Sequence, residues 1–141
     1  MNLETLRHQH ESLEELVEEL IAAIATNDPR PVATIRWRLA RELIAHLAIE
    51  DRWLYPRLRQ SSLPQTAELA TRFFAEMGGL KEAFNNYMTH WTDPLIALDW
   101  PGFRRETHMV MAQLRARIDR ENAQLYPLAE REEKHASSRA A

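Results

Sequence analysis

Residues 43–56 of the chain read LIAHLAIEDRWLYP, and residues 114–127 read LRARIDRENAQLYP. The two stretches align without a gap: each begins with leucine, carries a glutamate seven positions later (Glu50 and Glu121), and ends in Leu-Tyr-Pro. Their apolar residues recur at helical spacing. The match indicates a duplicated helical hairpin that brings Glu50 and Glu121 together near a pseudo-twofold axis. Two carboxylates placed there repel each other unless a cation lies between them.

The composition is that of a single globular domain: 141 residues, of which 45% are hydrophobic and 28% charged. The net charge of −3 provides no basic surface for nucleic acid or anionic lipid. The absence of cysteine excludes disulfides, thiolate metal sites and cysteine nucleophiles. No apolar run approaches the roughly 20 residues that span a membrane, and the N-terminus lacks an export signal. We therefore expect a cytoplasmic protein that binds neither nucleic acid nor membranes.

Helix-breaking residues gather in three places: NDPRP at 27–31, SSLP at 61–64, and TDPLIALDWPG at 92–102. Each place offers an Asx or Ser side chain followed by proline, which is typical of a helix start. The four helical segments that remain each carry an apolar stripe. Short connections favour an all-α, up-down-up-down antiparallel four-helix bundle. We expect this bundle to span residues 1–131 and the polar tail, residues 132–141, to be disordered.

Five polar residues interrupt the apolar stripes at positions where leucine would serve: His10, His46, Glu50, Arg117 and Glu121. A buried charge is costly unless it is paired or bound to a metal. His46 and Glu50 lie four residues apart, so a helix places them about 40° and about 6 Å from each other, on one face. Imidazoles and carboxylates that converge from facing helices are how helical bundles build iron sites.

The pattern resembles the hemerythrin-like, or HHE cation-binding, family. The resemblance is carried by His10, by the stretch HLAIE at residues 46–50, and by the Leu-Tyr-Pro ending at residues 54–56, and it covers about residues 3–130. It implies a four-helix bundle that holds a carboxylate-bridged di-iron centre. It also implies a role in binding oxygen, handling nitric oxide, storing or sensing iron, or signalling.

The resemblance provides ligands for one metal ion. His10, His46 and Glu50 match the first-half ligands of the family, and Glu121 matches the second bridging carboxylate. Such a set can hold one Fe(II), or a zinc or manganese ion in its place. We therefore expect one iron ion or none, and no intact di-iron centre.

The second half of the site departs from the family pattern. Met77 and Arg117 stand where histidines are expected, and Phe73 lies one turn before Met77, where the oxygen carriers have a further histidine. A guanidinium stays protonated and has no lone pair to give a metal. We expect Arg117 to pair with Glu121, Glu50 or both, and to substitute electrostatically for the second iron.

Three functions remain open at this point. The first is a non-enzymatic cation-binding protein with a mononuclear or vacant site, which senses or regulates the response to iron, oxygen or redox stress. The second is a metal-free helical signalling module in which Arg117 replaces the second iron. The third is a mononuclear Fe(II) enzyme, for which the sequence shows no second acid–base group. The expected partners are a metal ion, a diatomic ligand and a regulatory protein, and the expected state is a monomer or homodimer.

Overall fold

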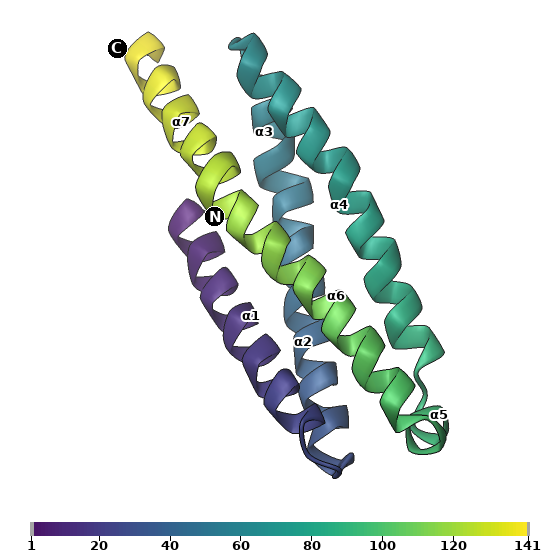
Figure 1. The fold of residues 1–141 in the computed structure, drawn as a ribbon. Coiled ribbons are helices and arrows are strands. Elements are labelled where there is room, and N and C mark those ends of the chain that lie inside the picture. Colours follow the sequence, from purple (N-terminus) through teal and green to yellow (C-terminus); the bar gives the residue numbers. More distant parts are fainter. Residues whose placement is uncertain (1, 141) are drawn as a thin grey trace.

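Four long helical segments run side by side in the computed structural model, which describes residues 2–140 (Figure 1). They are, in order, α1 (Leu3–Ile24); α2 (Arg30–Ile49) with η1 (Glu50–Leu54) and α3 (Tyr55–Arg59); α4 (Pro64–His90); and α6 (Trp100–Arg120) with η2 (Glu121–Leu125) and α7 (Tyr126–Ala140). A short helix, α5 (Asp93–Leu98), lies in the connection between α4 and α6. The described residues form no strand, and the predicted all-α helical bundle is confirmed.

The three predicted breaks all fall between helices. Side chains cap three of the helix starts: Asn2 accepts from the Thr5 N–H, Thr92 from the Leu95 N–H, and Asp99 from the Gly102 N–H. The starts of α2 and α4 instead carry proline in the first turn, where its missing N–H costs no hydrogen bond. None of the described helices is long and apolar enough to cross a membrane.

The tail differs from the prediction of disorder over residues 132–141. Helix α7 continues to Ala140, and its stretch REEKHA at 131–136 consists mostly of good helix formers. The Ser61 hydroxyl donates to Glu132, and Ser62 Oγ lies 3.2 Å from His135 Nε2, so the loop before α4 contacts this helix. Met1 and Ala141, the outer limits of the predicted domain and tail, lie outside the described residues.

Two apolar clusters fill the bundle, and a polar layer separates them. One cluster packs around Leu6, Leu54 and Phe73, and the other includes Leu13 and Leu43. On α1, the polar layer falls between Leu6 and Leu13. The apolar clusters keep water from this layer on both sides, which strengthens electrostatic interactions inside it.

A π turn begins at each of the two glutamates that the sequence repeat places together. In η1, the Tyr55 N–H donates to the Glu50 carbonyl, and in η2 the Tyr126 N–H donates to the Glu121 carbonyl. The proline after each tyrosine explains the wide turn, because in a regular α-helix its ring would clash with the carbonyl four residues earlier. A regular helix would also place residue i+5 about 140° away from residue i. The wider turn rotates each tyrosine toward the interior of the bundle, where both tyrosine side chains are buried.

Replacement of Gly102 by alanine is expected to destabilise the protein. A Cβ added at Gly102 would lie 2.3 Å from Asp99 Oδ2, so the carboxylate that caps α6 must move away. The loss of such a cap costs about 1 kcal/mol of unfolding free energy. Gly78→Ala is the matched control, because its Cβ meets no atom within 4 Å and should instead stabilise α4 by about 1 kcal/mol. Urea denaturation measures both, and shifts in the same direction would contradict this account.

Candidate metal centre

Side chains from three segments of the bundle converge in the polar layer. The ligand atoms of His10, His46, Glu50 and Glu121 all lie within 4.8 Å of one another. His10 comes from α1, His46 and Glu50 from the end of α2 and the start of η1, and Glu121 from η2. Each of the four residues is at most 2% exposed to solvent. The structure thus brings together the four residues that the sequence analysis selected.

Both histidines present Nε2 to this cluster, because amide oxygens hold their other ring nitrogens. His10 Nδ1 lies 2.8 Å from Asn122 Oδ1, and His46 Nδ1 lies 2.8 Å from Gln9 Oε1. An amide oxygen accepts, so each Nδ1 carries a proton that it donates. Metal-binding histidines are commonly oriented in this way by a partner on the outer nitrogen. The sequence analysis missed Gln9 and Asn122, although each is adjacent in sequence to a predicted ligand.

Two polar atoms in the cluster are buried without a hydrogen bond. They are His46 Nε2 and Glu50 Oε1, which lie on the two ligands from the second segment. Unsatisfied buried polar groups are rare in native proteins and call for an unseen partner. Imidazole and carboxylate ligands lie about 2.1 Å from a metal such as zinc, so ligands on opposite sides of one ion are about 4.2 Å apart. The four ligand atoms lie within 4.8 Å of one another, slightly more than that value, so small side-chain movements would let the cluster hold one divalent ion.

Two tyrosines donate hydrogen bonds into the cluster. Tyr126 donates to Glu50 Oε2 over 2.9 Å, and Tyr55 donates to Glu121 Oε2 over 3.3 Å. Each tyrosine therefore contacts the carboxylate of the opposite half of the repeat. Burial, together with the negative charges of the two carboxylates, raises the pKa of both phenols far above the ordinary value, so they remain donors.

Comparison with protein families identifies the family of this helical bundle. The family model described as hemerythrin HHE cation binding domain matches residues 1–129. The chain belongs to the hemerythrin HHE family. Comparison with curated proteins and comparison with solved structures find no match. The match extends over both halves of the repeat, so the second half of this HHE domain can be compared with the first.

Arg117 occupies the position in the second half of the HHE domain that His46 occupies in the first. Arg117 Nε lies 3.4 Å from Glu121 Oε2, and its Nη2 donates to the Tyr55 hydroxyl and to the Phe73 carbonyl. The expected pairing with Glu121 is therefore present, but through a single nitrogen. The remaining donors point toward Tyr55 and α4, and not toward Glu50.

The charges of the cluster shift its pKa values in the metal-free protein. Burial lowers the pKa of His46, but the neighbouring Glu121 and Glu50 carboxylates outweigh burial and raise it to about 9. Burial raises the pKa of Glu121, but contact with His10 and His46 and the charge of Arg117 lower it to about 2. Burial and the Glu121 charge raise the pKa of Glu50. His46 therefore carries a proton at neutral pH that a bound cation would displace.

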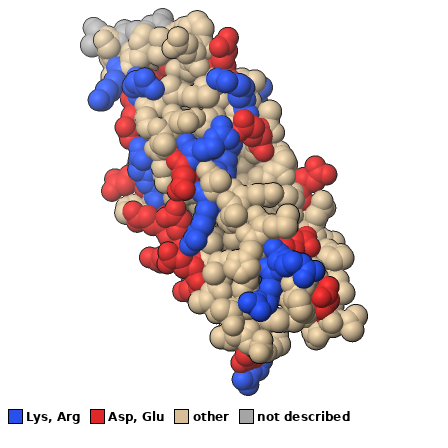
Figure 2. Space-filling model, in the orientation of Figure 1, with Lys and Arg blue, Asp and Glu red and all other residues tan. Residues whose placement is uncertain are grey.

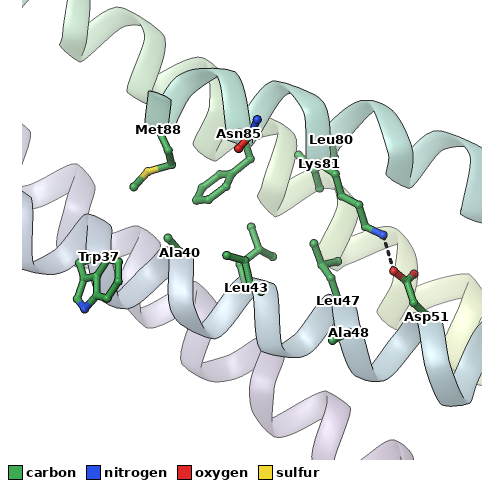
Figure 3. A pocket seen from close by; sticks show the side chains of 12 residues that line it. Trp37, Ala40, Leu43, Leu47, Ala48, Asp51, Leu80, Lys81, Asn85 and Met88 are labelled. Carbon is green, nitrogen blue, oxygen red and sulfur yellow. Dashed lines mark hydrogen bonds and ion pairs between the residues drawn. The ribbon is translucent and has the colours of Figure 1, made fainter. Parts of the chain in front are cut away.

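Other polar and apolar surface features lie outside this cluster. Of the five glutamates between residues 11 and 19 of α1, four are exposed and one, Glu14, is half-buried; the exposed ones are Glu11, Glu15, Glu18 and Glu19. Figure 2 shows acidic side chains along the edge of the molecule where α1 lies. His8, His90 and His108 are exposed. An apolar groove of about 400 Å³ runs between α2 and α4, from Trp37 and Met88 to the Asp51–Lys81 ion pair (Figure 3). None of the residues that line this groove is one of the four ligands.

Replacement of Gln9 by leucine is expected to weaken metal binding about 10- to 100-fold, because His46 Nδ1 loses the acceptor that orients its ring. Isothermal titration with Zn(II) measures the change in dissociation constant. Ser12→Ala is the matched control: Ser12 lines the same surface pocket of about 410 Å³ and donates to Glu42, not to the cluster. Equal affinities for Gln9→Leu and Ser12→Ala would show that the Gln9 contact does not orient a ligand.

Proposed function

We propose that this HHE domain binds one divalent metal ion and responds to it without catalysing a reaction. The ligands are His10, His46, Glu50 and Glu121. Fe(II) is the expected ion in the cell, since the family is defined by cation binding and this donor set suits iron. The role that follows is regulation of a response to iron, oxygen or redox stress, carried out in the cytoplasm through a regulatory protein partner.

One observation carries the proposal: an imidazole nitrogen, His46 Nε2, and a carboxylate oxygen, Glu50 Oε1, lie in one buried cluster without a hydrogen bond, although His46 Nε2 is within 3.3 Å of the other Glu50 oxygen. His46 Nε2 is fixed in place by the Gln9 contact at Nδ1, and Glu50 Oε1 is completely buried beside it. A cation satisfies both atoms at once. In the metal-bound protein His10 and His46 act as neutral donors, while Tyr55 and Tyr126 hold the outer carboxylate oxygens.

Burial of the four ligands supports a sensing role over an enzymatic one. A bound Fe(II) would supply redox chemistry and affinity for a diatomic ligand. Each ligand is almost fully enclosed, so a small gas such as oxygen or nitric oxide reaches the cluster more readily than an organic substrate. The cluster also lacks a separate acid–base residue beyond the ligands and the two high-pKa phenols.

A metal-free signalling module is the second candidate, and the charges of the cluster favour it. The two carboxylates Glu50 and Glu121 face two cations, the Arg117 guanidinium and the His46 imidazolium with its pKa of about 9. The cluster is therefore close to neutral without a metal. Such a balance also allows the metal to leave without unfolding the domain, as reversible sensing requires.

Metal content per chain distinguishes the two candidates. After anaerobic incubation with Fe(II) and gel filtration, mass spectrometry is expected to find one iron per chain in the wild type. His46→Ala should hold almost none, because the ion loses an imidazole ligand. His90→Ala, at an exposed histidine outside the cluster, should keep one ion. No metal in the folded wild-type protein would favour the metal-free module, and two ions would contradict the mononuclear site.

A further inference from the structure

We propose that Arg117 is a tethered cation that occupies the place of a second metal ion and makes this a one-ion site. The inference rests on the proposed function, since it concerns the same cluster. It goes further because it assigns a function to the residues that depart from the family pattern. These residues hold a positive charge of the protein in place of a metal ion, and have not simply lost the ability to bind one.

Two of the three departures from the family pattern, Phe73 and Arg117, contact each other. Arg117 Nη2 donates to the Phe73 carbonyl over 2.6 Å, and the guanidinium carbon lies 4.5 Å from the centre of the Phe73 ring. An aromatic face and a carbonyl both stabilise a desolvated guanidinium. Phe73, at one of the family's histidine positions, therefore stabilises the guanidinium of Arg117, which stands at another.

Glu121 divides its two oxygens between the two halves of the cluster. Oε1 lies 3.0 Å from His10 Nε2, on the side of the predicted ligands. Oε2 lies 3.4 Å from Arg117 Nε and accepts from Tyr55. A bridging carboxylate gives one oxygen to each of two cations. Here the second oxygen faces the fixed positive charge of Arg117.

Apart from Glu121, the second half offers no metal ligand at the positions that match the family's histidines. Phe73 has no donor atom, Met77 offers only a thioether, and the Arg117 guanidinium has no lone pair. Met77 and Phe73 are both buried, so solvent does not reach these positions to supply a ligand in their place. A guanidinium in this place satisfies Glu121 Oε2 without a second ion.

Arg120 provides a matched control for Arg117. The two guanidiniums both contact the Glu76 carboxylate and both lie over the Phe73 ring, at 4.8 Å for Arg120 and 4.5 Å for Arg117. They differ in position: the Arg117 side chain is 7% exposed and touches Glu121, whereas the Arg120 side chain is 46% exposed and does not. A comparison of the two isolates the effect of the buried charge.

The proposal predicts two effects of opposite sign in Arg117→Met. The metal-free variant should be less stable, because Glu121 Oε2 loses its cation. Its affinity for Zn(II) should nevertheless rise at least about tenfold, because a positive charge that repels the ion in a low-dielectric site is gone. A purely structural role for Arg117 would weaken both properties together. Arg120→Met should change neither by more than about twofold.

The test is Zn(II) titration by calorimetry, with a competing chelator where binding is tight, on wild type and both methionine variants. Arg117→Lys, which keeps the charge, should bind Zn(II) within about threefold of wild type, and Arg117→Gln serves as the neutral variant if methionine prevents folding. Unchanged or weaker Zn(II) affinity in the neutral variants would overturn this inference and leave the one-ion function standing. Two ions per wild-type chain would also overturn it. Absence of any binding by the wild type would overturn both.

Discussion

Saturation with Zn(II) is expected to raise the midpoint of thermal unfolding of the metal-free protein by about 10 °C. An ion that binds only the folded state, at 1,000 times its dissociation constant, stabilises that state by about 4 kcal/mol. For a domain of this size each kcal/mol shifts the midpoint by roughly 3 °C. The structural reason is that the ion satisfies His46 Nε2 and Glu50 Oε1, two buried atoms that make no hydrogen bond in its absence. Circular dichroism with and without Zn(II) measures the shift.

The control for this effect is Glu50→Gln, which keeps the shape of the side chain and removes the charged ligand. Its midpoint should move by less than about 3 °C on addition of Zn(II), because the ion loses a carboxylate that is fully buried at the centre of the cluster. An equal shift in wild type and Glu50→Gln would place the stabilising ion elsewhere, for example on the acidic face of α1. That outcome would contradict the proposed ligand set.

Replacement of Glu121 by alanine is expected to lower the unfolding free energy of the metal-free protein by about 3–5 kcal/mol. Removal of one partner of a buried ion pair leaves the other charge uncompensated. Glu121 is the point where His10, Tyr55 and Arg117 all meet, and it is 1% exposed. Urea denaturation in the presence of a chelator measures the loss without interference from a bound ion.

Glu76→Ala is the matched control for Glu121→Ala. Glu76 also pairs with Arg117, but its side chain is 47% exposed, and surface ion pairs contribute less than about 1 kcal/mol. The two glutamates therefore separate a buried contact of Arg117 from an exposed one. Similar losses of unfolding free energy in the two variants would mean that the burial of Glu121 does not determine how strongly its contacts stabilise the protein.

Helix breaks and apolar stripes were sufficient to predict the helical bundle. Helical periodicity identifies the buried face of each segment, and a histidine or glutamate on a buried face must have a partner. Polar residues in an apolar stripe stand out without knowledge of the contacts, and the resemblance to the HHE family then indicated His10, His46, Glu50 and Glu121 as candidate ligands. This reasoning could not identify Gln9 and Asn122, because the periodicity of a single helix does not show which polar neighbour turns toward another helix.

The two tyrosines show why local sequence was insufficient. The motif Leu-Tyr-Pro did not indicate a role for the tyrosines in the cluster, since a regular helix turns residue i+5 away from residue i. The prolines instead produce the π turns η1 and η2, and these turns bring Tyr55 and Tyr126 over the carboxylates. The change affects the backbone hydrogen bonds of a single turn. The spacing of hydrophobic residues in the sequence does not indicate such a change.

The sequence by itself determined the helices, the buried polar positions and the lack of histidines at the ligand positions of the second half-site, because residue identity and helical spacing suffice for each. Only the tertiary structure decided which groups meet across helices. It turned Nε2 of both histidines inward through Gln9 and Asn122, and it gave Arg117 a single contact to Glu121 and not a bidentate one. Those outcomes depend on the distances between four helical segments, and such distances are set by packing of the whole core and not by any one segment.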